Sequence, residues 1–127
     1  MKKVLALIAS ALLLAGCSSS SGAIDLSVTE FSAKVAEVGV ITLDVRTPGE
    51  FAEGHVKGAR LIDFQSGNFE NEIATLDKNA TYAVYCRSGN RSGQAVKVMR
   101  DAGFTKVFNM NGGVIDWASA GLPLVRN

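Results

Sequence analysis

The sequence predicts an α/β domain with a parallel, helix-covered sheet. Residues 40–45 and 81–86 are short runs of apolar and β-branched residues, which is typical of strands buried on both faces. The segments between and after them carry helical spacing and helix-capping residues instead. Strands separated by helices pair in parallel, because each crossover returns the chain to the same edge of the sheet.

The first expected helix begins after Ser27. Ser27 and Glu30 have the spacing of a capping box, in which each side chain satisfies a free backbone N–H at the helix start. Gly39 marks its end. One apolar face is expected on this helix: Val28, Phe31, Val35 and Val38. The buried strand 40–45 follows directly.

The middle of the chain predicts shorter elements. Thr47, Pro48 and Glu50 begin a short helix, with proline at the tolerated first position and glutamate placed to complete the cap. A short strand is expected at residues 59–62, and a helix over roughly residues 68–76.

The last third predicts a helix, a strand and a helix after the strand 81–86. The first of these helices ends at Gly103, and the following strand covers residues 106–109. Gly112 and Gly113 open a final short helix, on which Trp117 belongs to the core. The core face of the first helix has i, i+3, i+4, i+7 spacing: Ala95, Val98, Met99 and Ala102.

The first residues have the pattern of an export signal. Lys2 and Lys3 precede an apolar run at residues 4–14, which is too short to span a bilayer as a helix. Residues 14–17 (LAGC) resemble a bacterial lipobox, so we expect cleavage before Cys17 and lipid on Cys17. Residues 1–16 are then the signal peptide, 17–23 a lipidated Ser/Gly tether and 24–127 the folded domain. The alternative is a plain cleavage site with an ordinary cysteine.

This assignment predicts a lipid-anchored protein on the periplasmic side of a bacterial membrane. Ser18 after the anchor is compatible with sorting to an outer membrane. The signal holds two of the 13 basic residues and none of the 12 acidic ones, so the mature chain has net charge −1. Such a balance disfavours nucleic-acid binding. We expect no cofactor and no metal, because the single histidine, His55, offers no histidine cluster.

The stretch that carries chemistry lies between the strand 81–86 and the next helix. Glycine and asparagine in a tight loop let successive N–H groups turn inward, and the helix start adds unpaired amides and a positive dipole end. These features and two arginines favour a thiolate, so the pKa of Cys86 should fall below the ordinary value of about 8.5. We expect Cys86 to be the nucleophile and the rest of the loop to bind substrate: Arg87, Ser88, Gly89, Asn90, Arg91 and Ser92.

Each candidate also has a structural interpretation. Cys86 could be a buried core cysteine, although the arginines and the glycine-bearing turn then lack an explanation. Arg87 and Arg91 could be solvated surface charges. Asp44 and Arg46 end a strand, and a structural ion pair near the site is favoured over catalysis. His55 is favoured as a hydrogen-bonded turn residue.

Three blocks together resemble the rhodanese homology domain: residues 43–51 (LDVRTPGEF) with 54–59 (GHVKGA), the loop 86–92 (CRSGNRS), and 111–113 (NGG) with Trp117 and 121–123 (GLP). They cover about residues 24–126 in family order. The resemblance implies a parallel five-stranded sheet and transfer of sulfane sulfur through a persulfide on Cys86. It implies thiosulfate or a similar donor, and cyanide, a thiol or an envelope protein as acceptor, by double displacement.

Two rival functions remain. Cysteine phosphatases and arsenate reductases use the same kind of loop, but phosphatases place arginine six residues after the nucleophile. Arg91 is five after Cys86, and position 92 is serine, so the ring of amides is one residue smaller and suits a single sulfur better. A non-catalytic rhodanese-like module that binds a partner is the other rival. Inactive relatives typically lack the cysteine that this chain keeps.

Overall fold

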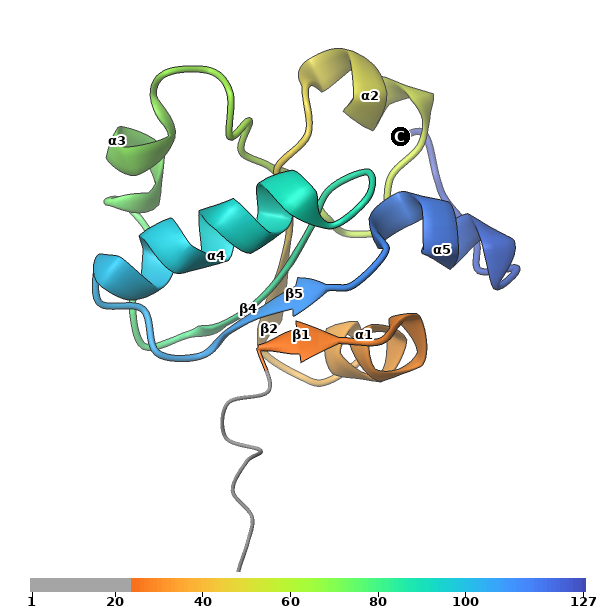
Figure 1. Ribbon diagram of the computed structural model, residues 1–127, viewed down its shortest axis with the longest axis horizontal. Coiled ribbons are helices and arrows are strands. Elements are labelled where there is room, and N and C mark those ends of the chain that lie inside the picture. Colours follow the sequence, from red (N-terminus) through yellow and green to blue (C-terminus); the bar gives the residue numbers. More distant parts are fainter. Residues whose placement is uncertain (1–23) are drawn as a thin grey trace, which may run out of the picture.

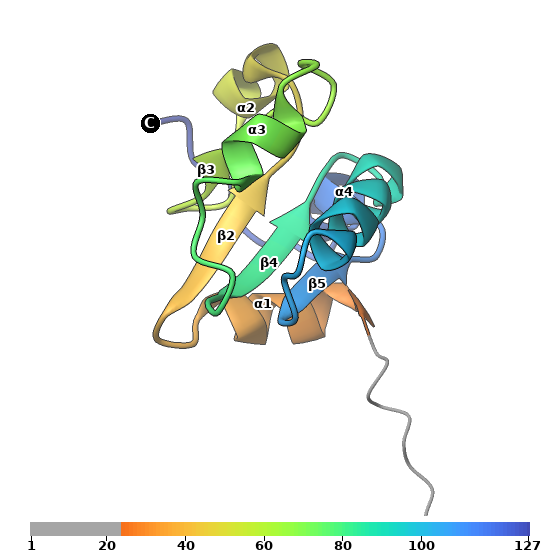
Figure 2. The same cartoon turned by 90° about the vertical axis from the view of Figure 1, so that its left-hand side faces the viewer.

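The computed structural model of the protein describes residues 24–127, so Cys17 and the expected signal peptide lie outside the described residues (Figure 1). Its centre is a five-stranded parallel sheet with strand order β1-β5-β4-β2-β3. This confirms the α/β class and the parallel sheet. Figure 2 shows β2, β4 and β5 side by side and pointing the same way. The strands are β1 (Asp25–Leu26), β2 (Val40–Asp44), β3 (Arg60–Leu61), β4 (Thr81–Tyr85) and β5 (Val107–Met110).

Five helices connect the strands and cover both faces of the sheet. They are α1 (Val28–Val35), α2 (Pro48–Glu53), α3 (Phe69–Ile73), α4 (Asn90–Asp101) and α5 (Gly113–Ser119). Helices α3 and α4 pack on one face, and α1 and α5 on the other, in two separate core clusters. Figure 1 shows α4 and α1 on opposite sides of the sheet.

Alternation along β4 decides which layer receives the cysteine. Tyr82, Val84 and Cys86 point into the layer of α3 and α4. Ala83 and Tyr85 point into the layer of α1 and α5. Because neighbouring residues of a strand face opposite sides, Cys86 emerges beneath the start of α4.

Both expected capping boxes are present. The Ser27 hydroxyl accepts from the N–H of Glu30, and the Glu30 carboxylate accepts from the N–H of Ser27. Thr47 and Glu50 repeat the arrangement at the start of α2, where Pro48 occupies the first turn. The predicted boundaries of these two helix starts are therefore confirmed.

Some details of the predicted faces were wrong. Val38 is fully exposed, because α1 ends at its C-cap Ala36 and the chain then turns at Gly39. On α4 the exposed Ala102 lies beyond the last helical residue. The buried α4 residues keep the expected spacing one turn earlier: Ser92, Ala95, Val96 and Met99. This shift puts a hydroxyl on the core face.

Strand β1 was not predicted as an element. It has two residues, and it pairs with β5 through Asp25 and Leu26. So short a segment gives no alternation pattern in the sequence, and only its partner strand defines it.

Trp117 is 4% exposed and contacts Phe31 edge-to-face, as expected for a core residue. No helix within residues 24–127 is long and apolar enough to cross a membrane.

Candidate active site

The candidate site lies at the carboxyl ends of β2 and β4. These strands are paired in register, with Asp44 opposite Tyr85, so the residues that follow them lie side by side at the carboxyl ends of the strands. Open α/β sheets bind ligands outside these carboxyl ends. Cys86 follows β4 directly, is 1% exposed, and is a free thiol.

Two donors point at the sulfur. The N–H of Gly89 lies 3.1 Å from Cys86 Sγ, and the hydroxyl of Ser92 lies 3.3 Å from it. Gly89 has φ +100°, a left-handed conformation, and an added Cβ would lie 3.2 Å from the backbone nitrogen of Gly112. Glycine is therefore required here for the turn that aims its own N–H at the sulfur.

These contacts set the acidity of the thiol. Burial alone would raise the pKa of Cys86, because a thiolate loses its hydration. The Ser92 hydroxyl and the nearby N–H groups of Ser92, Gly89 and Ser88 favour the anion, and the net pKa is lowered. The lowered pKa agrees in direction with the sequence prediction, and the donors that lower it are uncharged.

The carbonyl groups of the loop are turned the other way. The carbonyl oxygen of Cys86 accepts from the N–H of Val114 at 3.0 Å, and that of Arg87 accepts from Ile115 at 3.1 Å. Both donors belong to the first turn of α5. With its carbonyls bound to α5, the start of the loop is fixed with its N–H groups free to face the sulfur.

Gly113 makes this contact possible. Its φ is +57°, and a Cβ there would lie 2.4 Å from the carbonyl oxygen of Arg87 and 2.6 Å from that of Cys86. Any side chain would push α5 away from the loop. The sequence predicted Gly113 at a helix start and within a family motif. Its close approach to the loop is visible only in the structure.

Arg91 is engaged by a carboxylate. Its two terminal nitrogens donate to Glu50 at 2.8 and 2.9 Å, and the pair is about three-quarters buried or more. This contact holds the pKa of Glu50 at about 2. Glu50 had been predicted only as a cap residue of α2, and its second role links α2 to the loop. No sequence signal connected residues 41 positions apart.

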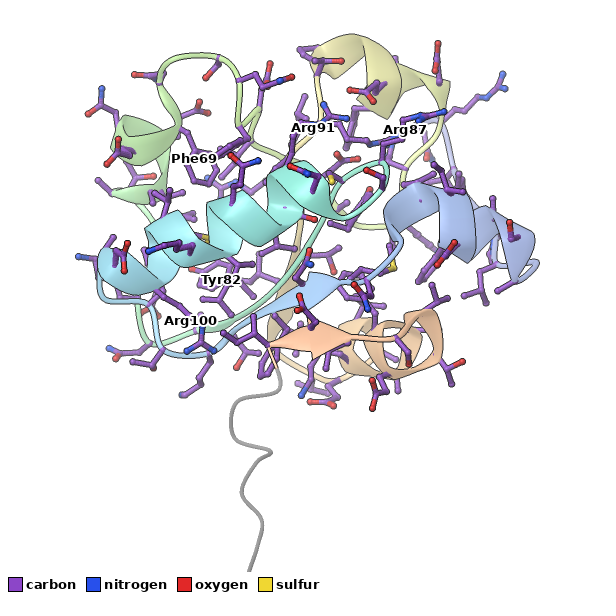
Figure 3. All side chains as sticks on the ribbon, viewed as in Figure 1. Phe69, Tyr82, Arg87, Arg91 and Arg100 are labelled. Carbon is purple, nitrogen blue, oxygen red and sulfur yellow. The ribbon has the colours of Figure 1, made fainter. Side chains whose placement is uncertain are left out.

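The other loop residues are more open. Arg87, Ser88 and Asn90 are exposed, and the Asn90 side chain accepts from Gln94 on the next turn of α4. Figure 3 shows Arg87 and Arg91 in the space between α2 and the loop that precedes α4. The structure therefore brings all seven loop residues to one place, where Cys86 and Ser92 are buried and Arg87 is exposed to solvent.

Asp44 and Arg46 form a buried ion pair beside the loop. The Arg46 guanidinium donates to both carboxylate oxygens of Asp44 at 2.6 to 3.1 Å, and also to the carbonyl oxygen of Gly54 at 2.7 Å. The Arg46 side chain is 6% exposed and the Asp44 side chain is 0% exposed. The pair joins the end of β2 to the end of α2, as a structural ion pair would.

His55 is a buried, hydrogen-bonded residue. Its Nδ1 lies 2.9 Å from the carbonyl oxygen of Phe51, its Nε2 lies 2.8 Å from an oxygen of Asn127, and its ring stacks on Phe51. Both ring nitrogens are thus occupied. Within residues 24–127 there is no group of three or more His, Cys, Asp or Glu side chains that could hold a metal ion.

Known proteins resemble the chain in sequence and in fold. A sequence model of the rhodanese-like domain matches residues 27–120. A sulfurtransferase of Allochromatium vinosum is 36% identical over 68% of this chain and 78% of its own length. The thiosulfate sulfurtransferase GlpE of Pseudomonas aeruginosa is 36% identical over 71% of this chain and 80% of its own.

A solved structure resembles the chain in fold. The crystal structure of a rhodanese-related protein from Thermoplasma volcanium superposes with a TM-score of 0.72 at 26% identity, over 81% of this chain and 98% of that one. The family match spans β2, β4, the loop and α5, which together build the site described above. The chain therefore belongs to the rhodanese-like family of sulfurtransferases.

Proposed function

We propose that the protein moves sulfane sulfur from thiosulfate or a similar donor to a thiophilic acceptor through a persulfide on Cys86. The observation that carries this proposal is the buried sulfur itself, which accepts hydrogen bonds from Gly89 and Ser92. A nucleophilic sulfur surrounded by fixed neutral donors can hold a negative charge before and after it gains a second sulfur. Relatives that bear the name thiosulfate sulfurtransferase support the donor class.

The reaction consists of two displacements at sulfur. The Cys86 thiolate attacks the outer sulfur of thiosulfate, a new S–S bond forms, and the S–S bond of thiosulfate breaks with sulfite leaving on the electron pair. The persulfide anion then keeps the charge within reach of the loop donors. A thiolate or cyanide attacks the terminal sulfur, and the Cys86 thiolate leaves unchanged.

Mass spectrometry of the intact protein tests this chemistry. Incubation with thiosulfate should add the mass of one sulfur atom and release one equivalent of sulfite, and a thiol should reverse the gain. Cys86→Ser should show neither event. A wild-type protein that hydrolyses a phenyl phosphate and gains no sulfur would instead support the phosphatase alternative.

The N-terminal residues carry a separate proposal, which rests on the sequence alone. Cleavage before Cys17 and lipid on its sulfur and amino group would anchor the domain at the periplasmic side of a bacterial membrane, with Ser18 compatible with the outer membrane. Membrane fractionation of cells should find the protein with membranes, and Cys17→Ser should release it or leave it unprocessed. Recovery of the wild-type protein in the soluble fraction would contradict the anchor.

A further inference from the structure

Asn109 is a buried amide on a strand face that is otherwise apolar. It lies in β5, between β1 and β4, and its register partners are Asp25 and Val84. Val107, two residues earlier in β5, belongs to the core between the sheet and α4, so alternation along the strand predicts an apolar residue at position 109. Asn109 is only 3% exposed. Burial of an amide is unfavourable unless hydrogen bonds compensate it, so the contacts of this side chain indicate its role.

The NH2 group of Asn109 makes these contacts. Nδ2 donates to the Asp25 carboxylate at 2.9 Å and to the carbonyl oxygen of Gly89 at 3.5 Å. Oδ1 is buried and has no hydrogen-bond partner within residues 24–127. Because a carboxylate can only accept, Asp25 fixes which end of the amide carries the two N–H groups. The second N–H then faces Gly89, the residue whose own N–H lies 3.1 Å from Cys86 Sγ.

Gly89 is the point of the loop at which the backbone can rotate most freely. The direction of its N–H therefore depends on what holds the chain on either side of it. On the side of the nucleophile, α5 binds the carbonyl oxygens of Cys86 and Arg87. On the other side, the Gly89 carbonyl oxygen accepts from the N–H of Gly93, in the first turn of α4, at 3.1 Å, and from Asn109. Asn109 thus supplies the side-chain contact that holds the second end of the loop.

We propose that Asn109 is a positioning residue of the active site. Its amide holds the carbonyl of Gly89, so that the N–H of the same residue stays directed at Cys86 Sγ. Asp25 orients the amide from β1, and the chain of contacts therefore runs from an exposed carboxylate to the buried thiol. The inference rests on the proposed function, since it names a residue that prepares Cys86 for attack on the sulfur donor. Asn109 acts through Gly89 and makes no hydrogen bond to the sulfur itself.

The pH profile of Cys86 alkylation by iodoacetamide separates positioning from a purely structural role. Asn109→Leu keeps a side chain that branches at Cγ and removes both donors together with the buried Oδ1. The N–H of Gly89 is then held less firmly toward the sulfur, so the profile should shift to higher pH. Persulfide formation from thiosulfate should slow by about three- to tenfold, the range that one net hydrogen bond spans. The urea midpoint should stay close to that of the wild type, because removal of a buried acceptor without a partner offsets the lost contacts.

Two further variants complete the comparison. Thr42→Val is the matched control, because Thr42 is also a buried polar residue of the sheet, at 7% exposure, but alternation along β2 turns its side chain into the layer opposite Leu43 and the Cys86 sulfur. It should change neither the profile nor the rate. Asp25→Ala alters an exposed side chain and leaves the amide of Asn109 free to turn its oxygen toward Gly89. It should shift the profile in the same direction as Asn109→Leu and by a smaller amount, and it replaces that variant in the test if Asn109→Leu does not fold.

The outcomes distinguish this inference from the function on which it rests. An unshifted alkylation profile in Asn109→Leu overturns the inference, and an equal shift in Thr42→Val overturns it as well, since any buried polar residue of the sheet would then have the effect. Alkylation needs no sulfur donor, so its profile is independent of sulfur transfer. If the wild-type protein gains no sulfur while Asn109→Leu still shifts the profile, the proposed function is overturned and the positioning of Gly89 stands.

Discussion

The ends of β2 and β4 lie side by side, and each holds a buried side chain that can carry negative charge, but the groups that contact these two side chains differ. At the end of β2, Asp44 is fully buried and its carboxylate is matched by the guanidinium of Arg46. At the end of β4, Cys86 is equally buried, and its sulfur is contacted by an N–H and a hydroxyl. One anion has a fixed counter-charge, and the other has only neutral donors.

Under the proposed function, this difference makes one end structural and the other reactive. A carboxylate bound through several hydrogen bonds to an arginine has no free electron pair directed at a substrate, and breaking the pair is costly. A thiolate held by neutral donors keeps its nucleophilicity, because no cation must be displaced for it to attack. Burial alone therefore does not identify a reactive group, whereas the kind of partner does.

The largest expected effect comes from breaking the ion pair of β2. Arg46→Met leaves the Asp44 carboxylate buried without a counter-charge, which should lower the free energy of unfolding by about 3–5 kcal/mol in urea denaturation. The double variant Asp44→Asn with Arg46→Met removes both charges and keeps an acceptor for the N–H of residue 46. It should recover most of the loss. A loss of less than about 1 kcal/mol of unfolding free energy in Arg46→Met would mean that the ion pair does not stabilise the end of β2.

The second effect tests the backbone support of the β4 end. Gly113→Ala places a Cβ 2.4 Å from the Arg87 carbonyl oxygen in a left-handed conformation, so α5 must move away from the loop. We expect a loss of about 2–3 kcal/mol in stability and a reduced rate of persulfide formation. Gly49→Ala is the control, because Gly49 has open space around it and lies in α2, where alanine is favourable. Equal behaviour of the two variants would contradict the proposed support.

The contrast between the two glycines shows which features can be predicted from the sequence and which depend on the fold. Both capping boxes followed from residues three apart, and the class and the parallel sheet followed from the order of strand and helix signals along the chain. Cys86 and its loop were predicted from their place between a strand and a helix, and their roles stay a prediction. The partners of the loop did not, since Gly113 and Glu50 reach it from other elements and only the fold brings them there. For this reason the expectation that Arg91 favours the thiolate was made without its partner Glu50.

A smaller effect concerns the donors at the sulfur. Ser92→Ala removes the hydroxyl contact of 3.3 Å, which favours the thiolate, so the pKa of Cys86 should rise. The pH profile of alkylation by iodoacetamide should shift to higher pH accordingly. Ser88→Ala is the control for this titration, because Ser88 acts through its backbone N–H, which alanine retains. An unshifted profile for Ser92→Ala would mean that the amides alone set the acidity.

The smallest effect concerns the pair that keeps Arg91 from acting as a free charge. Glu50→Gln retains the cap of α2, since glutamine also completes a capping box, and removes only the charge that binds Arg91. The loss of stability near neutral pH should be about 1 kcal/mol, reduced by screening because both side chains are about a quarter exposed. Asp101→Asn, in an exposed pair with Lys97, should cost less than about 0.5 kcal/mol.

The pH dependence of that loss identifies its origin. The folded-state pKa of Glu50 is about 2, below its ordinary 4.5, so the unfolded chain binds the proton first as the pH falls. The advantage of the wild type over Glu50→Gln should be complete above about pH 4.5 and disappear as the pH falls toward 2, in urea unfolding at each pH. A constant difference over this range would show that the contact is not ionic. Arg91 would then be a free cation near the sulfur, and the two strand ends would differ less than their contacts indicate.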